Sequence, residues 1–347
     1  MAESSTTEAG AGPTRRQTLE SVARHAAVSR QTVSNVLNSP HLVRPETLQR
    51  VQAAIAELDY RPLLAARQLR TRRSRIIGLR LPQVTNGING AVLDTFLHAL
   101  TEEAQLGGYR VMLFTATDDT DEVARYSELL ATTSIDGFVL TGTHHGDPRT
   151  AWLAVHEVPF VTFGRPWSDR PAGHSWVDVD NAAGTRAATE HLLALGHRRI
   201  GFLGCPADRG VSDERRAGWR STLAAAGLPP APELDIASTD EVSEGVVGAR
   251  RLLAAADPPT AIVCASDSLA IGARSALPAV TGFDDTPVAA ALGITSVAQP
   301  LVEAARECFV LLRHHVERPH GDGASPPAEH RMLAPRLVVR PQPSVDR

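Results

Sequence analysis

Residues 18–69 constrain the fold more than any other stretch, because apolar residues recur there at the spacing of three short helices. Thr18 and Ser29 are suited to cap the first two helices, and Pro45 is suited to begin the third. A tight turn at residues 26–28 separates the first helix from the second. Two short helices joined by such a turn are typical of the helix-turn-helix motif, whose second helix lies in the DNA major groove.

The second predicted helix has a polar outward face. The side chains expected to project from it are Arg30, Gln31, Thr32, Ser34 and Asn35. Gln and Asn can bond adenine bidentately, Arg can bond guanine, and Thr can touch a thymine methyl group. The alternative interpretation is a solvated polar face on a three-helix bundle.

The charge distribution supports an interaction of this face with DNA. Residues 15–75 hold twelve Arg and four acidic residues, a local charge of +8. The whole chain has a net charge of -4, so the remainder carries -12. A basic head on an acidic body is typical of a DNA reader with a separate sensor.

From residue 76 onward, strand-like runs alternate with helical stretches. Strands are predicted at residues 76–81, 111–115, 137–141, 159–163, 176–179, 200–204, 261–265, 279–283 and 337–340. Helices are predicted at 91–105 and 180–195, among others. This βαβα order predicts parallel sheets with helices on both faces. The pattern restarts around residues 175–179, which indicates two similar lobes.

Three segments resemble the head of the LacI-type (lactose-repressor) family of bacterial transcription regulators: VSRQTVSNVLN, RPETLQRVQAAIAELDYRP and AARQLRTRRSRIIG. The resemblance covers almost the whole chain after Thr14. It implies an N-terminal all-α helix-turn-helix head and an α/β body of two doubly wound, periplasmic-binding-protein-like lobes joined by three crossovers. It also implies that Arg30, Gln31 and Asn35 read operator bases, and that Leu69 of a short hinge helix wedges between base pairs.

The expected domains follow from the pattern and the resemblance together. They are a disordered tail (1–14), a helix-turn-helix domain (15–61), a hinge helix and linker (62–75) and a two-lobed body (76–342). The first lobe takes about 76–178 and 299–330, and the second about 179–298 and 331–342. Crossovers are expected near Val177 and Gln299.

The expected DNA contacts are Thr18, Ser29, Arg30, Gln31, Thr32, Ser34, Asn35, Asn38, Ala66 and Leu69. Three residues of the head depart from the family pattern. Ala27 stands where Gly is usual, which has a cost if φ is positive there. Asn35 replaces a common Arg, which favours adenine readout, and Arg44 replaces the usual Ser cap of the third helix.

Ligands of two-lobed α/β folds bind at the carboxyl ends of the strands. The expected ligand contacts are Asn86, Arg165, Arg215, Ser266, Asp284 and Gln299. The resemblance implies that Arg215 and Asp284 contact ligand hydroxyls, with ion pairing across a solvated cleft as the alternative. Arg165 lies where some sugar sensors have Asp, which favours an anionic ligand, and residues 271–282 are short against the family pattern.

An enzyme or a transport function is less consistent with the sequence than a DNA-binding regulator. It has no G-x-S-x-G, H-E-x-x-H or C-x-x-C motif, and the absence of Lys rules out a Walker A loop. Cys205, Cys264 and Cys308 are too dispersed for a zinc site. We expect no catalytic site, metal or cofactor. A free solute-binding protein would need an export signal and no basic head.

We therefore predict a ligand-responsive DNA-binding regulator, most simply a repressor. A carbohydrate-like ligand is expected, and an anionic one is the variant that Arg165 favours. One short head buries too little DNA for specific binding, so we expect a homodimer on a pseudo-palindromic operator. No apolar run suits a secretory signal or a membrane span, and we expect a cytosolic, nucleoid-associated protein.

Overall fold

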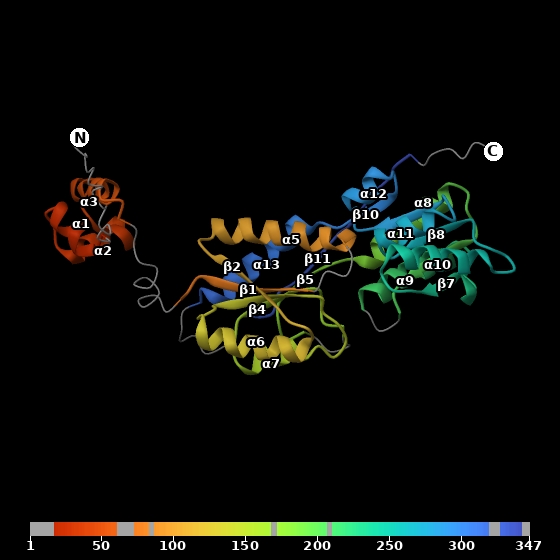
Figure 1. The fold of residues 1–347 in the computed structure, drawn as a ribbon, viewed down its shortest axis with the longest axis horizontal. Coiled ribbons are helices and arrows are strands. Elements are labelled where there is room, and N and C mark those ends of the chain that lie inside the picture. The colour runs from red at the N-terminus through yellow and green to blue at the C-terminus, as the bar shows by residue number, and fades with distance from the viewer. Residues whose placement is uncertain are drawn as a thin grey trace, which may run out of the picture. The chain divides into compact units, whose positions relative to one another are not determined.

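A computed structural model of the chain describes residues 17–60, 73–82, 87–167, 172–206, 210–318 and 327–341. The chain divides into two compact units, Met1–Arg73 and Ser74–Arg347 (Figure 1). The predicted tail at 1–14 and the predicted hinge helix at 63–71 lie outside the described residues.

The N-terminal unit is a small helical head. Its elements are α1 (Leu19–His25), α2 (Arg30–Asn38), the 3-10 turn η1 (Pro40–Leu42) and α3 (Pro45–Glu57). Val22, Val33 and Val51, one from each α-helix, are completely buried and form the centre of its core. The predicted three-helix arrangement is confirmed, since the apolar faces of α1, α2 and α3 pack against one another in a single cluster.

The helix ends of the head follow from particular residues. Thr18 caps α1 by accepting a hydrogen bond from the Ser21 amide at 3.2 Å, and Ser29 caps α2. Arg44 provides no side-chain cap for α3, as the sequence predicts. Ala27 has φ of +50°, so a side chain occupies a left-handed position that favours glycine.

The first lobe of the body is built on a six-stranded parallel sheet with the order β11-β5-β4-β3-β1-β2. Its strands are β1 (Ile76–Leu81), β2 (Arg110–Thr115), β3 (Gly137–Thr141), β4 (Phe160–Phe163), β5 (Trp176–Val179) and β11 (His330–Leu333). Its helices are α5 (Gly87–Leu106), α6 (Asp119–Thr132), α7 (Pro148–Val155) and α13 (Leu301–Val316). Figure 1 shows α5 and α13 on one face of this sheet and α6 and α7 on the other.

The side chains along each strand point alternately to the two faces of this sheet, which explains why helices cover both faces. On β3, Val139 packs in the cluster with α5 and α13, whereas Phe138 and Leu140 pack in the cluster with α6 and α7. Successive side chains of a strand point to opposite faces, so a strand that is apolar throughout needs a cover on each side.

The second lobe repeats this arrangement with a sheet of order β12-β10-β9-β8-β6-β7, in which only β12 is antiparallel to its neighbour. Its strands are β6 (Ile200–Gly204), β7 (Asp235–Ala237), β8 (Ala261–Cys264), β9 (Val280–Phe283), β10 (Thr295–Ala298) and β12 (Arg336–Val338). Its helical segments are α8 (Asn181–Ala194), α9 (Val211–Ala225), η2 (Pro232–Leu234), α10 (Val242–Leu253), α11 (Asp267–Arg274) and α12 (Pro287–Ala291).

The predicted strands are present, with ends that differ by one or two residues. Strands β7, β10 and β11 are not predicted, because three or four residues with polar members give little periodic signal. Strand β11 pairs with β5 through Leu333, so the last crossover comes three residues later than the predicted boundary at 330. Residues 271–282, which are fewer than the family pattern has, do not disturb the sheet, because the strand at the end of this stretch, β9, still pairs between β8 and β10.

Helix α9 lies very close to α8, and Gly218 makes this approach possible. A β-carbon at Gly218 would collide with the Ala182 carbonyl oxygen and with Oγ1 of Thr185, both on α8. We expect Gly218→Ala to destabilise the body by about 1–3 kcal/mol, because the overpacking outweighs the better helix propensity of alanine. Urea unfolding of the full chain would measure this change in the free energy of unfolding.

The matched control is Gly173→Ala, since no atom lies within 4 Å of a β-carbon built at that exposed position. Its unfolding free energy should change by less than about 0.5 kcal/mol. Equal effects of the two substitutions would show that the α8–α9 contact is not tight.

Candidate functional site

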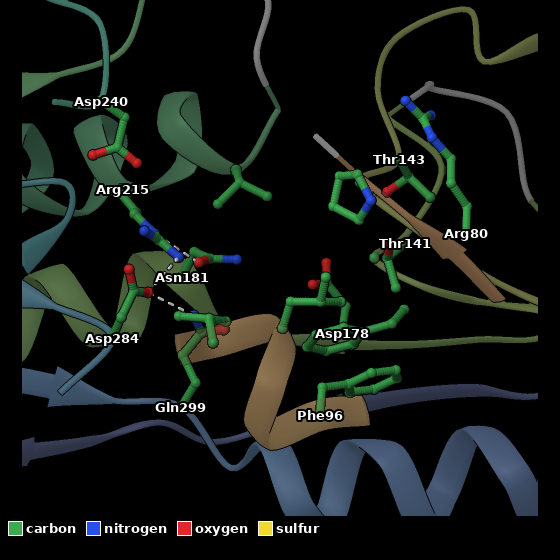
Figure 2. Close-up of a pocket in the computed structure, with 17 residues that line it drawn as sticks. Arg80, Phe96, Thr141, Thr143, Asp178, Asn181, Arg215, Asp240, Asp284 and Gln299 are labelled. Atoms are coloured by element: carbon green, nitrogen blue, oxygen red, sulfur yellow. Dashed lines mark hydrogen bonds and ion pairs between the residues drawn. The ribbon is translucent and has the colours of Figure 1, made fainter. Parts of the chain in front are cut away.

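The two lobes enclose a cavity of about 500 Å³ at the carboxyl ends of their strands. The first lobe contributes Arg80, Phe96 and Asp178 to its lining, among others, and the second contributes Arg215 and Asp240. Figure 2 shows these side chains facing one another across the space. Lining from both lobes makes the size of this cavity dependent on how the lobes close.

Arg215, from the second turn of α9, is the best-anchored polar group of the cavity. Its Nε donates to Oδ1 of Asn181 at 2.9 Å, and its Nη1 donates to the carbonyl oxygen of Ala265 at 2.5 Å. Its Nη2 lies 3.7 Å from Oδ1 of Asp284 (Figure 2). Its guanidinium covers the Phe283 ring, with Cζ 3.5 Å from the ring centroid. With these contacts the guanidinium plane is fixed before any ligand enters.

Asp284 lies on a strained backbone directly after β9. Its φ is +107°, and that of Asp285 is +51°, both in the left-handed region that favours glycine. Asp267 holds this loop, because its carboxylate accepts from the Thr286 amide at 2.6 Å and from the Ser296 hydroxyl at 2.5 Å. The strain is maintained by these buried contacts, and it directs Asp284 into the cavity.

The charge state of Asp284 is shifted by its surroundings. Burial raises the pKa of Asp284 to about 7, an effect that the Arg215 guanidinium and the Gln299 amide oppose. Nε2 of Gln299 donates to Oδ1 of Asp284 at 2.7 Å. Gln299 lies just after β10, at the crossover between the lobes, as predicted.

The other predicted ligand contacts are placed differently. Ser266 does not line the cavity; its hydroxyl caps α11 and donates to Asp240, which does line it. Arg165 does not line it either, and forms ion pairs with Asp178 and Glu214. Asn86 lies outside the described residues.

Sequence reasoning missed several lining residues. Asp178 is the one acidic residue within the buried strand β5, and an acidic residue in a buried strand is a sequence signal for a functional position. Asp240 follows β7, which is too short to predict. Arg80 is held by Glu122, whose Oε2 accepts from its Nη1 at 2.7 Å.

One group in the first lobe has the composition of a metal site. The carboxylates of Asp119 and Asp147 and the His144 ring offer atoms within 4.8 Å of one another. However, Nη2 of the buried Arg149 lies 2.6 Å from Asp147, and its Nε lies 3.6 Å from Asp119. This guanidinium already supplies the positive charge, which argues against a cation there.

In the head, the predicted base-reading residues Arg30, Gln31 and Asn35 lie together on α2. Arg30 and Gln31 are exposed, and Nε2 of Gln31 donates to Oδ1 of Asn35 at 2.9 Å. Thr18 and Ser29 are helix caps, and Thr32 bonds the Ser29 hydroxyl. Ser34 is half-buried on the same helix, the side chain of Asn38 is not described, and Ala66 and Leu69 lie outside the described residues.

A helix-turn-helix head combined with two α/β lobes around a cavity defines a class of protein, the helix-turn-helix regulators with a periplasmic-binding-protein-like body. Residues 18–62 match the bacterial regulatory proteins of the lacI family, and residues 77–286 match the periplasmic binding proteins and sugar binding domain of the LacI family. The chain belongs to the LacI family of bacterial transcription regulators.

Similar proteins cover nearly the whole chain. The HTH-type transcriptional regulator CelR of Thermobifida fusca is 36% identical over 344 residues, which are 94% of this chain and 98% of CelR. A solved CelR–cellobiose complex is 31% identical, with a TM-score of 0.68 over 94% of this chain and 99% of that one. A lac repressor dimer bound to operator and the anti-inducer ONPF is 25% identical, with a TM-score of 0.74 over 94% of this chain and 98% of that one.

No helix within the described residues combines the length and the apolar character needed to cross a membrane.

The raised pKa of Asp284 predicts a particular pH dependence of stability. The folded chain holds this proton more tightly than the unfolded chain, whose Asp pKa is about 4. The resulting stability is present at low pH and is lost as pH rises to about 7. The Asp284→Asn variant lacks this titration and therefore serves as the reference. The difference in unfolding free energy, wild type minus variant, should fall by up to about 1.4 kcal/mol for each pH unit between roughly pH 4 and 7.

Urea unfolding of both proteins between these pH values would measure the slope. A difference that does not change with pH would show that Asp284 is not buried as a proton-binding group.

Proposed function

We propose that this protein is a transcriptional repressor whose affinity for operator DNA is controlled by a neutral, hydroxyl-rich ligand, a sugar or sugar derivative, bound between the lobes. The observation that carries the proposal is the hydrogen-bonded and ion-paired group of Arg215, Asn181, Asp284 and Gln299 in a cavity that both lobes line. Carboxylate and guanidinium groups bond neighbouring hydroxyls of one ligand from fixed directions.

The charges of the lining favour a neutral ligand over an anionic one. Three carboxylates line the cavity, those of Asp178, Asp240 and Asp284, against the guanidinium groups of Arg80 and Arg215. Both guanidinium groups already have carboxylate partners, so neither is available as the counter-charge of an anionic ligand. The expectation of an anionic ligand depends on Arg165, which does not line the cavity.

An aromatic surface in the first lobe supports a ring-shaped ligand. Phe163 is partly exposed at the cavity and is backed by Phe96, which is only 1% exposed, and the two rings are stacked, with centroids 4.7 Å apart and planes 7° from parallel. Sugar rings present an apolar face to such surfaces, while their hydroxyls reach polar groups. The complex of CelR with cellobiose is a precedent in a relative for a sugar at a LacI-family regulator.

For DNA recognition, we propose that α2 enters the major groove and that Arg30, Gln31 and Asn35 read base edges. The hydrogen bond between Gln31 and Asn35 holds their amides next to each other on consecutive turns of α2. The other predicted DNA contacts, including Ala66 and Leu69, remain proposals. A protein with this partner acts in the cytoplasm, at the nucleoid.

A second copy of the chain would complete operator recognition. Strand β2 is at the edge of the first sheet, where Leu113 is 43% exposed, and Leu106 at the end of α5 is 82% exposed. Such an edge with apolar residues is a reasonable dimer surface. Two heads would read a pseudo-palindromic operator, and the lac repressor dimer on its operator is a precedent in a relative.

The proposed control is thermodynamic linkage. A ligand that binds better to one lobe arrangement shifts the population toward it, and the heads of that state bind operator differently. Coupling of about 1–3 kcal/mol corresponds to a change of roughly 5–150-fold in operator affinity.

Gln31→Ala tests base reading. We expect it to weaken operator binding by about 1–3 kcal/mol, because one bidentate base contact is lost, while binding to random duplex is nearly unchanged. Operators selected from random duplexes would serve in fluorescence anisotropy. The matched control is Gln52→Ala, an exposed Gln on α3, which should leave both affinities unchanged. Equal losses on operator and random duplex would contradict base reading by Gln31.

Arg215→Ala tests the ligand site. A thermal-shift panel of cellobiose, other disaccharides, monosaccharides and sugar phosphates would first identify a ligand for the wild type. The variant should lose that thermal shift and the ligand's effect on operator binding, while keeping operator binding itself. The control is Arg220→Ala, a 57% exposed Arg on the same helix whose ion pair with Asp235 lies outside the cavity. A normal ligand response in Arg215→Ala would reject the site.

A further inference from the structure

Arg165 forms an ion pair that crosses from one lobe to the other. It follows β4 of the first lobe, and its Nη2 contacts Oε1 of Glu214, which lies in the first turn of α9 in the second lobe. The two side chains are 25% and 26% exposed, so water reaches this pair only partly.

A second carboxylate shares the same guanidinium. Oδ2 of Asp178, on β5 of the first lobe, lies 3.2 Å from Nε of Arg165, and the Asp178 side chain is only 5% exposed. Both Oδ2 of Asp178 and Oε2 of Glu214 are buried, and within the described residues neither atom accepts a hydrogen bond of good geometry, so Oδ2 of Asp178 depends on its ion pair with Arg165. Arg165 is therefore the cation between two carboxylates that come from opposite lobes.

The contact beside this group is tightly packed and also joins the lobes. The Trp167 side chain lies under the Arg165 guanidinium at 4.9 Å and donates from Nε1 to the Thr143 carbonyl oxygen at 3.0 Å, which anchors it to the first lobe. Gly210, which precedes α9, faces this ring so closely that a β-carbon there would collide with it. A small movement of the lobes would separate the ion pair and this contact together.

We propose that Arg165 is a positioning residue that holds the two lobes closed, and that it does not contact the ligand. Without Arg165, Asp178 and Glu214 would face each other as like charges across the lobe boundary, in a setting where water screens them poorly. Repulsion would then replace attraction, and the cleft would open. Because Asp178 lines the cavity, the same group couples lobe closure to the ligand space.

The proposal uses the cavity of the proposed function, but its test needs neither ligand nor DNA. Spin labels on Ala151→Cys (α7) and Arg251→Cys (α10), both exposed sites, would report the distance between the lobes by double electron–electron resonance. A Cys205→Ser background removes the one partly exposed cysteine, since Cys264 and Cys308 are buried. Dilution with unlabelled protein suppresses signals between copies.

Arg165→Met should shift the distance distribution to longer values or broaden it. Adding Glu214→Gln to that variant should move the distribution back toward the parent, because the charge that faces Asp178 is gone. A role of Arg165 in packing against Trp167 alone would not be rescued by this second change. Circular dichroism would establish that each variant is folded.

The matched control is Arg125→Met, which breaks ion pairs with Asp121 and Glu128 inside α6 of the first lobe and should leave the distribution unchanged. An unchanged distribution in Arg165→Met, or a shift that Glu214→Gln does not reverse, would overturn the proposal. Either result would leave the ligand and operator experiments unaffected, so failure of this proposal is distinguishable from failure of the proposed function.

Discussion

The polar lining of the cavity between the lobes depends on the contacts of one buried group, the guanidinium of Arg215. A charge in a protein interior is costly unless it is paired and hydrogen-bonded, so its surroundings must supply partners. They come from three segments: Asn181 at the start of α8, the Ala265 carbonyl after β8 and Asp284 after β9. These segments meet only when the second sheet is correctly ordered. The contacts that stabilise this lobe are therefore the same contacts that fix the polar lining of the cavity.

The strained loop after β9 shows how this preparation is maintained. Two consecutive residues, Asp284 and Asp285, occupy positions that favour glycine, and strain of this kind persists only where the surrounding structure determines it. Asp267 provides that support from the start of α11, through buried bonds to Thr286 and Ser296. Asp267 thus shapes the cavity without lining it, and this support of the loop explains why a carboxylate is buried there.

The two lobes contribute different chemistry to one space. The second lobe supplies Asn181, Arg215, Asp240 and Asp284, whereas the first supplies the stacked Phe96 and Phe163 together with Arg80 and Asp178. A ligand that satisfies both sets must bridge the lobes, and its binding energy then depends on their closure. This dependence is what a regulator needs, because a body with two arrangements can bias a DNA-binding head, whereas a rigid cavity cannot.

The sequence by itself determined the family and most of the elements. Local signals sufficed for them, since the Thr18 and Ser29 caps and the apolar strands such as β1, β3 and β6 are formed by neighbouring residues. Only the tertiary structure decided that Asp178 lines the cavity and that Arg165 meets Glu214 instead. Arg165 and Glu214 are separated by tens of residues and belong to different lobes. Periodicity records which face of an element is buried, but the pairing of polar side chains depends on how separate sheets pack, which no local pattern encodes.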